Sequence, residues 1–215
     1  MTYDPRKHHR RSIRLKGYDY TQEGAYFVTI VAAHHQEIFG EIDHGGMRLS
    51  PLGRIVHEEW LRSIAIRREI WLYEDEFVIM PNHIHGIVWI TSANEPPVGA
   101  YGVRPDDASP YNDHYPPQPR ADSIRPYEKF ANGKTAFQRA PKSLGSFIAG
   151  FKSSVTSRAR RELGLDQVWQ GNYFDQIIRN ERIFQAIWDY IETNPQQWEL
   201  DRLHPNASPN RFNQS

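Results

Sequence analysis

The sequence predicts an α+β fold in which helices pack on one face of an antiparallel sheet, with a further helix near the C-terminus. Three observations favour this class. Short runs rich in β-branched and aromatic residues, such as 25–31 and 83–90, are typical of strands. Longer segments with apolar residues at helical spacing lie between them. Turn residues and prolines separate these segments into the order strand, helix, strand, strand, helix, strand, helix.

The first half of the chain contains a strand, a hairpin and a helix. Residues 25–31 form the first predicted strand. Residues 38–50 are expected to form a hairpin, because an Asp-His-Gly-Gly run supplies its turn. Ser50-Pro51 then has the form of an N-cap followed by proline at the first helical position. The helix is predicted from Pro51 to about Arg67.

The second half completes the pattern. Strands are expected at 71–80 and 83–90, and a helix from Ser143 to about Glu162. A last strand is predicted at 173–178, and a final helix from about Asn180 to Thr193. With helices on one side of the sheet, the order β-α-β-β-α-β is the ferredoxin-like order.

Composition limits the class of protein. The 215 residues are enough for one domain with a core of ordinary size. The absence of cysteine excludes thiolate metal sites, disulfides and cysteine nucleophiles. The N-terminus lacks the apolar segment of a secretory signal, and the apolar runs are far shorter than the ~18–20 residues of a membrane span. We therefore expect a cytoplasmic protein without a membrane partner.

The sequence divides into one predicted domain, an N-terminal arm, an internal insertion and a C-terminal tail. Residues 23–92 and 141–200 are expected to form a single domain, preceded by a basic arm over residues 1–22. Residues 93–140 carry eight prolines among small and polar residues, without periodicity, which predicts a flexible insertion. Residues 201–215 are expected to be a C-terminal tail.

The net charge of zero conceals two basic segments. Residues 6–16 and 134–161 contain several Lys and Arg residues and no Asp or Glu. Such segments are often solvated surface, but interleaved aromatic residues favour contact with a polyanion such as nucleic acid. The candidate DNA-binding residues are Arg10, Arg11, Arg14, Lys16, Tyr18, Tyr20, Lys152, Arg158, Arg160 and Arg161.

Candidate chemistry begins with His83 and His85, which point to the same face of a predicted strand. Two neutral imidazoles so placed can chelate a divalent metal, and they can equally be a structural pair. On the final helix, Tyr190 and Asn194 are neighbours at i and i+4. Alone, Tyr190 is typical of a core or boundary tyrosine, and Asn194 before Pro195 is typical of a helix end.

Together these motifs resemble those of the HUH single-tyrosine transposases, most closely the REP-associated tyrosine transposase branch. The resemblance begins in the basic Gly-Tyr-Asp-Tyr lead at 11–20 and continues through 77–87, which contains the His-hydrophobic-His element. It resumes at 168–170 and 175–181, and it ends in the Tyr-x-x-x-Asn-Pro motif at 189–195. It covers nearly all of the chain outside the insertion.

The resemblance implies that His83, His85 and Asn194 hold Mg²⁺ or Mn²⁺, and that Tyr190 is the nucleophile on the C-terminal helix. Such enzymes nick single-stranded DNA beside a hairpin and transfer the strand through a 5′-phosphotyrosine. A ligand set of histidine and amide groups, without a carboxylate, is expected. Related transposases occur as monomers and as dimers, so a homodimer is one expected state, with Tyr190 acting in cis or in trans. DNA-bound protein would be nucleoid-associated.

Three alternatives remain open. A domesticated hairpin-DNA-binding protein would keep the fold without mobility. A replication-type HUH nuclease would share the sheet and the histidine pair. A cupin-like or hydrolytic metal enzyme would need further His or Glu ligands on neighbouring strands, and it would have no role for Tyr190.

Overall fold

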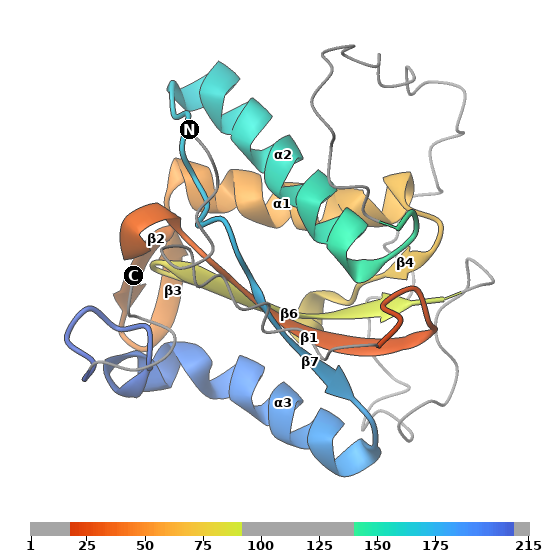
Figure 1. Cartoon of the computed structure of the whole chain (residues 1–215). Helices are drawn as coiled ribbons and strands as arrows, with labels where there is room; N and C mark the ends of the chain where they lie inside the picture. The colour runs from red at the N-terminus through yellow and green to blue at the C-terminus, as the bar shows by residue number, and fades with distance from the viewer. Residues whose placement is uncertain (1–17, 92–139, 209–215) are drawn as a thin grey trace, which may run out of the picture.

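The computed structural model describes residues 18–91 and 140–208 (Figure 1). The expected basic arm up to residue 17 and the insertion over 93–139 lie outside the described residues. Within the described residues, no helix is long and apolar enough to cross a membrane.

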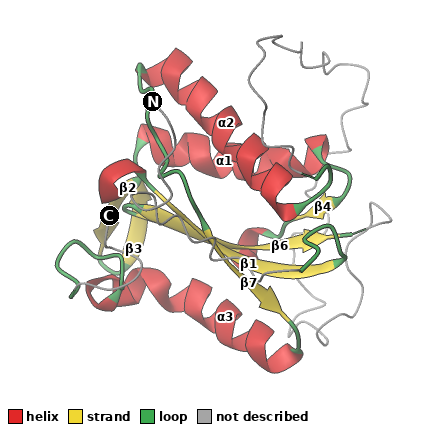
Figure 2. Cartoon of the chain, viewed as in Figure 1, coloured by secondary structure: helices red, strands yellow, loops and turns green. Residues whose placement is uncertain are grey.

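The main sheet is antiparallel throughout. At its centre β6 (His83–Ile90) pairs with β1 (Gly24–Val31), and β1 pairs on its other edge with β7 (Phe174–Ile178). Two short strands, β4 (Ile70–Trp71) and β5 (Phe77–Met80), share the free edge of β6. This order, β5-β6-β1-β7, confirms the ferredoxin-like expectation. Figure 2 shows β6, β1 and β7 side by side in the sheet.

One predicted strand differs from the structure. The segment expected as a continuous strand over 71–80 is interrupted by a 3-10 turn, η2 (Glu74–Glu76). In this turn Glu76 is buried and accepts a hydrogen bond from Nε1 of Trp89 at 2.6 Å. A buried carboxylate is costly unless it accepts a hydrogen bond, and the turn places Glu76 where Trp89 can donate one.

Helices cover both faces of the sheet. Helices α1 (Pro51–Ile66) and α2 (Leu144–Leu163) lie on one face, as expected, and α3 (Glu181–Thr193) lies on the other (Figure 1). Each helix begins with a polar side chain that accepts a backbone N–H. These N-caps are Ser50, Ser143 and Asn180. A small hairpin, β2 (Gly40–Asp43) and β3 (Gly46–Leu49), forms a separate two-stranded sheet.

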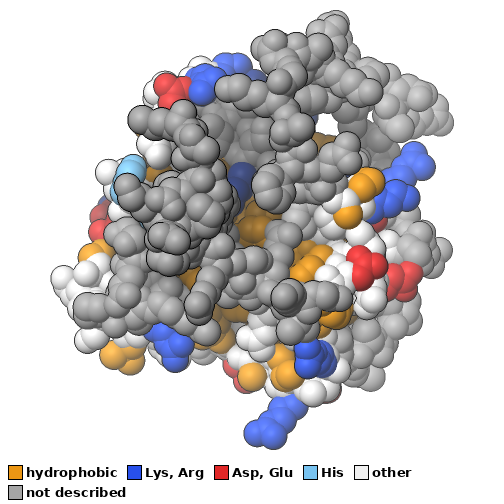
Figure 3. Space-filling view, viewed as in Figure 1, with side chains coloured by type: hydrophobic (Ala, Val, Ile, Leu, Met, Phe, Trp, Pro, Cys, Tyr) orange, Lys and Arg blue, Asp and Glu red, His pale blue; other side chains and the backbone are white. Residues whose placement is uncertain are grey.

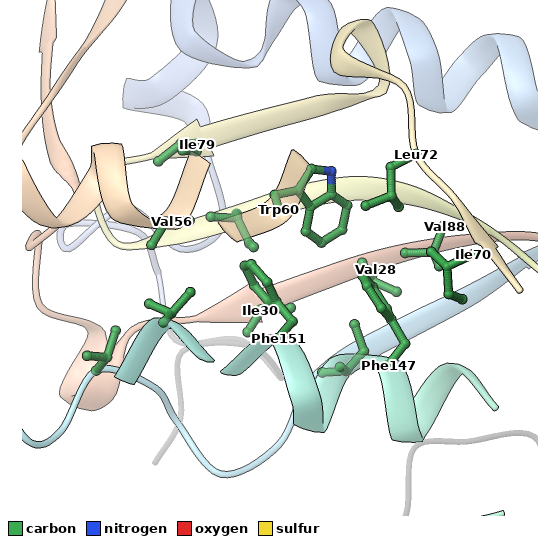
Figure 4. Close-up of a cluster of buried hydrophobic side chains, with 14 of the residues drawn as sticks. Val28, Ile30, Val56, Trp60, Ile70, Leu72, Ile79, Val88, Phe147 and Phe151 are labelled. Atoms are coloured by element: carbon green, nitrogen blue, oxygen red, sulfur yellow. The ribbon is translucent and has the colours of Figure 1, made fainter. Parts of the chain in front are cut away.

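The core between the sheet and α1/α2 is built around Trp60. Its ring stacks on Phe77 at a centroid distance of 4.5 Å. It meets Phe147 and Phe151 edge-on at 5.6 and 5.2 Å (Figure 4). Gly86 on β6 lies directly beneath this indole, since a Cβ there would stand 2.6 Å from Trp60. The packing therefore locks β6, the strand that carries both histidines.

Side chains along β6 alternate between the two faces of the sheet, and this alternation decides on which face the two histidines lie. Ile84, Val88 and Ile90 point into the core under α1 and α2, whereas Ile87 and Trp89 pack with α3. His83 and His85 have the same parity as Ile87, so they lie on the α3 side of the sheet.

The chain continues past α3 in ordered form. Asn194 begins a 3-10 segment, η4 (Asn194–Leu200), which follows α3 directly. Of the expected tail over 201–215, residues 201–208 are described, and Asp201, Leu203 and His204 are buried.

Candidate active site

The histidine pair is held by the register of β1 and β6. His85 lies opposite Thr29 on β1, and His83 lies opposite Val31. Both histidines are almost fully buried, and their Nε2 atoms are 2.9 Å apart. The single strand β6, held in register by β1, therefore brings both imidazole nitrogens to one point.

The other ring nitrogen of each histidine has its own partner. Nδ1 of His83 lies 2.8 Å from Oδ1 of Asn82, and Nδ1 of His85 lies 2.8 Å from Oγ1 of Thr29. Partners of this kind orient the ring of a metal-binding histidine and select the nitrogen left for the metal. Because Asn82 and Thr29 occupy the two Nδ1 atoms, both Nε2 atoms are left to face a common ligand.

Helix α3 brings Tyr190 to the same point. Its hydroxyl oxygen is 3.1 Å from Nε2 of His85. The phenol ring packs edge-on against Phe27, whose ring stacks on His85. The side chain of Tyr190 is 38% exposed, so the hydroxyl points into the site while part of the ring faces solvent.

Asp201 completes the cluster, and no motif in the sequence pointed to it. Its Oδ2 accepts a hydrogen bond from the Tyr190 hydroxyl at 3.1 Å and lies 3.9 Å from Nε2 of His83. The backbone N–H of Leu203 donates to its Oδ1 at 2.6 Å. The available sequence signal was the pair of large apolar residues Trp198 and Leu203 on either side of Asp201, which favours packing of this segment against the domain. Both residues are buried in the structure.

Candidate ligand atoms of His83, His85 and Asp201 lie within 4.8 Å of one another. A carboxylate thus stands where only histidine and amide groups were expected. Asn194 is buried beside it, with Nδ2 3.4 Å from Oδ2 of Asp201. Its Oδ1 is buried without a hydrogen-bond partner. The amide oxygen is therefore still available to a ligand.

Burial determines the protonation of the site. It lowers the pKa of His83 to about 3, with a further contribution from nearby His35. It also lowers the pKa of His85 well below its ordinary value, although Asp201 acts in the opposite direction. Burial and the Asp201 carboxylate raise the pKa of Tyr190. Both histidines are thus neutral at pH 7, as metal ligands must be, and the phenol is protonated.

The predicted DNA-binding residues are not gathered at this site. Arg10, Arg11, Arg14 and Lys16 lie outside the described residues. Tyr18 and Tyr20 pack against each other and against the core on the α1/α2 side. The four basic residues of α2 lie on the helix across the sheet from α3, and each has polar or acidic partners. Their partners are Gln170 and Asn172 for Lys152, Glu58, Glu59 and Glu162 for Arg158, Asp166 for Arg160, and Glu162 for Arg161.

On the face shown in Figure 3, the Lys and Arg side chains of the described residues stand in several separate places and form no single patch. The DNA-binding role of these ten residues stays a prediction.

Comparison with known proteins gives one close relative. The sequence matches no protein-family model. An uncharacterized protein of Haemophilus influenzae is 36% identical over 202 residues, which cover 94% of this chain and 97% of the Haemophilus protein. The shared region spans the histidine strand and α3, so the two chains have the same domain.

Two solved structures are similar to this chain at low identity. One is a REP-associated tyrosine transposase bound to a REP hairpin, with 15% identity, a TM-score of 0.48, and coverage of 88% of this chain and 76% of the other. The second is a candidate transposase from Deinococcus radiodurans, with 13% identity, a TM-score of 0.40, and coverage of 83% and 95%.

Proposed function

This chain belongs to one protein family with the Haemophilus influenzae protein, and we propose that it is a metal-dependent, single-tyrosine transposase that nicks single-stranded DNA. Tyr190 is the proposed nucleophile. His83, His85 and Asp201 are the proposed metal-binding side chains, with Asn194 as a further oxygen ligand.

One observation carries the proposal: the Tyr190 hydroxyl lies 3.1 Å from Nε2 of His85 and 3.1 Å from Oδ2 of Asp201. A structural tyrosine needs one hydrogen-bond partner for its hydroxyl. This hydroxyl instead lies among the converging atoms of a potential metal site. Joining a nucleophile to such a site is the arrangement required for attack on a phosphodiester.

The donor set suits a hard divalent ion. The carboxylate and the unpartnered amide oxygen are ligands of the kind that Mg²⁺ and Mn²⁺ prefer, and the two neutral imidazoles add borderline nitrogen donors, which suit Mn²⁺ better than Mg²⁺. The two Nε2 atoms lie 2.9 Å apart, so both nitrogens could face the same ion. When bound, the ion would polarise the scissile phosphate and offset charge in the transition state.

The chain's own residues would then carry out the attack. Tyr190 would attack phosphorus and form a 5′-phosphotyrosine, releasing a 3′-hydroxyl. Its proton is held between the phenol oxygen and Oδ2 of Asp201, the nearest carboxylate among the described residues. Phe27 would hold the His85 ring and the phenol in place from the side. The covalent link keeps the energy of the broken phosphodiester, so rejoining needs no ATP.

The substrate in this proposal is single-stranded DNA next to a hairpin. This part rests on the sequence motifs that resemble REP-associated tyrosine transposases. An unpaired strand can bend to bring one phosphate to the partly exposed face of Tyr190. A replication-type HUH nuclease would use the same chemistry on a different DNA. A hairpin-binding protein without chemistry would have no use for the Tyr190 contacts.

Covalent trapping tests the proposal. A hairpin-bearing oligonucleotide is labelled at its 5′ end in one sample and at its 3′ end in another, then incubated with Mn²⁺ and the protein. We expect the 3′-labelled fragment to migrate with the protein on a denaturing gel, and the 5′-labelled fragment to be released. The opposite pattern, or trapping in EDTA, would contradict the mechanism.

Tyr190→Phe is the matching variant, since it removes only the hydroxyl and keeps the ring against Phe27. We expect binding without trapping. Tyr173→Phe, at a residue that packs against the core on the α1/α2 side of the sheet, is the control and should trap DNA as the unmodified protein does. Trapping by Tyr190→Phe would rule out this nucleophile.

A further inference from the structure

Asn82, the residue before β6, is fully buried, and its side chain contacts two separate parts of the molecule. Its Oδ1 lies 2.8 Å from Nδ1 of His83. Its Nδ2 donates to the backbone oxygen of Leu203 at 2.7 Å, and at 3.4 Å to that of His35. Carbonyl oxygens only accept hydrogen bonds, so the amide nitrogen must be on this side. One side chain therefore joins the histidine strand to the C-terminal segment, residues 201–208, which follows η4.

Leu203 is the residue of this segment that holds Asp201 in place. Its backbone N–H donates to Oδ1 of Asp201 at 2.6 Å, while its backbone oxygen accepts from Asn82. The other carboxylate oxygen, Oδ2, accepts from the Tyr190 hydroxyl at 3.1 Å and lies 3.9 Å from Nε2 of His83. Asn82 and Asp201 thus face the two different nitrogens of one imidazole, and Leu203 links them.

The C-terminal segment needs a partner outside itself to be oriented. The N–H groups of Asp201, His204 and Ala207 donate to carbonyl oxygens three residues earlier, at 2.9 to 3.1 Å, and these bonds only shape its turns. Burial of the Leu203 side chain attaches the segment to the domain, but the hydrophobic effect has no direction. The hydrogen bond from Asn82, 121 positions earlier in the chain, supplies a direction.

We propose that Asn82 is a positioning residue that acts at a distance: by docking the peptide of Leu203, its amide sets the place of the Asp201 carboxylate. The functional meaning of this inference rests on the proposed metal site, but the docking itself needs no metal. Groups of a functional site must be held within about 0.5 Å, and loops hold them less precisely than helices or strands. Asp201 lies on a turn, so it depends on such support more than the histidines of β6 do.

Hydrogen exchange in EDTA tests the docking directly. The reporter is the Leu203 N–H, whose protection depends on its bond to Asp201. In Asn82→Ala we expect it to exchange about 5- to 100-fold faster, the range expected when a buried hydrogen bond is lost. The N–H of Val28, in the central strand β1, reports global stability and should change less. Asn206→Ala, at an exposed residue of the same segment, is the control and should leave exchange at Leu203 unchanged.

Two further measurements do not depend on the folding of Asn82→Ala. Asn82→Asp keeps the shape and an oxygen toward His83, but an ionised carboxylate cannot donate to Leu203, so we expect fast exchange there as well. In the unmodified protein, the side-chain Nδ2–H that is bonded to Leu203 should exchange slowly. Rapid exchange of both Nδ2 protons would overturn the docking.

Mn²⁺ binding, measured by electron paramagnetic resonance, shows whether Asn82 acts through Asp201. If Asn82 acted only on the His83 ring, the losses of affinity in Asn82→Ala and Asp201→Asn would multiply in the double variant. Because Asn82 positions Asp201 in this proposal, part of its effect is already lost in Asp201→Asn. We therefore expect the double variant to bind at least about fivefold more tightly than the product of the two losses predicts.

The outcomes separate this inference from the proposed function. Losses of Mn²⁺ affinity that multiply would overturn the role of Asn82 and leave the proposed function standing. Exchange at Leu203 that rises no more than exchange at Val28 would do the same. A protein that binds no divalent ion, yet loses protection at Leu203 in Asn82→Ala, would overturn the metal-dependent function and support the docking.

Discussion

The hydroxyl of Tyr190 donates to Oδ2 of Asp201 at 3.1 Å, and the same oxygen lies 3.9 Å from Nε2 of His83. One carboxylate therefore touches both the proposed nucleophile and the histidine pair. The N–H of Leu203 holds the other carboxylate oxygen at 2.6 Å. The turn after η4 thus fixes the orientation of a group that joins β6 to α3.

Asp201→Asn should weaken the metal site and leave the fold intact. The amide is isosteric but uncharged, so it is a poorer ligand and a poorer proton acceptor for Tyr190. We expect Mn²⁺ binding, measured by electron paramagnetic resonance, to weaken about 10-fold or more, and trapping of DNA to fall at least as much. The control is Glu199→Gln, an exposed carboxylate that pairs with His204. Equal effects at both positions would argue against a specific role for Asp201.

Adding metal should raise the melting temperature. An ion that binds only the folded state stabilises it by about 2.7 kcal/mol at a free concentration 100 times its dissociation constant. For a chain of this size, that corresponds to roughly 5–10 °C. We expect scanning calorimetry to show the increase with Mn²⁺ and its reversal by EDTA. The double variant His83→Gln/His85→Gln should show no increase, and a full increase in that variant would place the ion elsewhere.

Gly86→Ala should destabilise the strand that carries the histidines. A Cβ at this position would stand 2.6 Å from the ring of Trp60 and 3.2 Å from that of Phe77. The stacked rings cannot separate without disturbing the core, and overpacking of this kind costs about 1–3 kcal/mol. Urea denaturation measures the loss. Gly171→Ala, where no atom lies within 4 Å of the new Cβ, should change stability by less than about 0.5 kcal/mol.

Glu59→Ala should destabilise the contact between α1 and α2. The Glu59 carboxylate is buried, accepts from Ser154 and pairs with Arg158. Removing it leaves these donors with fewer partners, at a cost of about 1–3 kcal/mol in denaturant unfolding. Glu58→Ala removes a half-exposed carboxylate that pairs with the same arginine, and should cost less than about 1 kcal/mol. A larger loss at Glu58 would show that the exposed pair holds the helices together.

The elements that carry the fold could be predicted from the sequence because local patterns specify them. β1, α1, α2 and α3 lie close to the predicted ranges, since apolar periodicity and the N-caps Ser50, Ser143 and Asn180 act within a few residues. The strand expected over 71–80 was the exception. Its interruption at Glu76 depends on a hydrogen bond from Trp89, which belongs to another strand.

The sequence by itself determined that His83 and His85 share a face, because alternation along a strand is a property of the backbone. It also placed Tyr190 and Asn194 one turn apart on one helix. Only the tertiary structure decided that α3 covers the same face as the histidines, and that Asp201 turns back to meet them. Those contacts join residues more than a hundred positions apart, and they depend on packing, which no local pattern encodes.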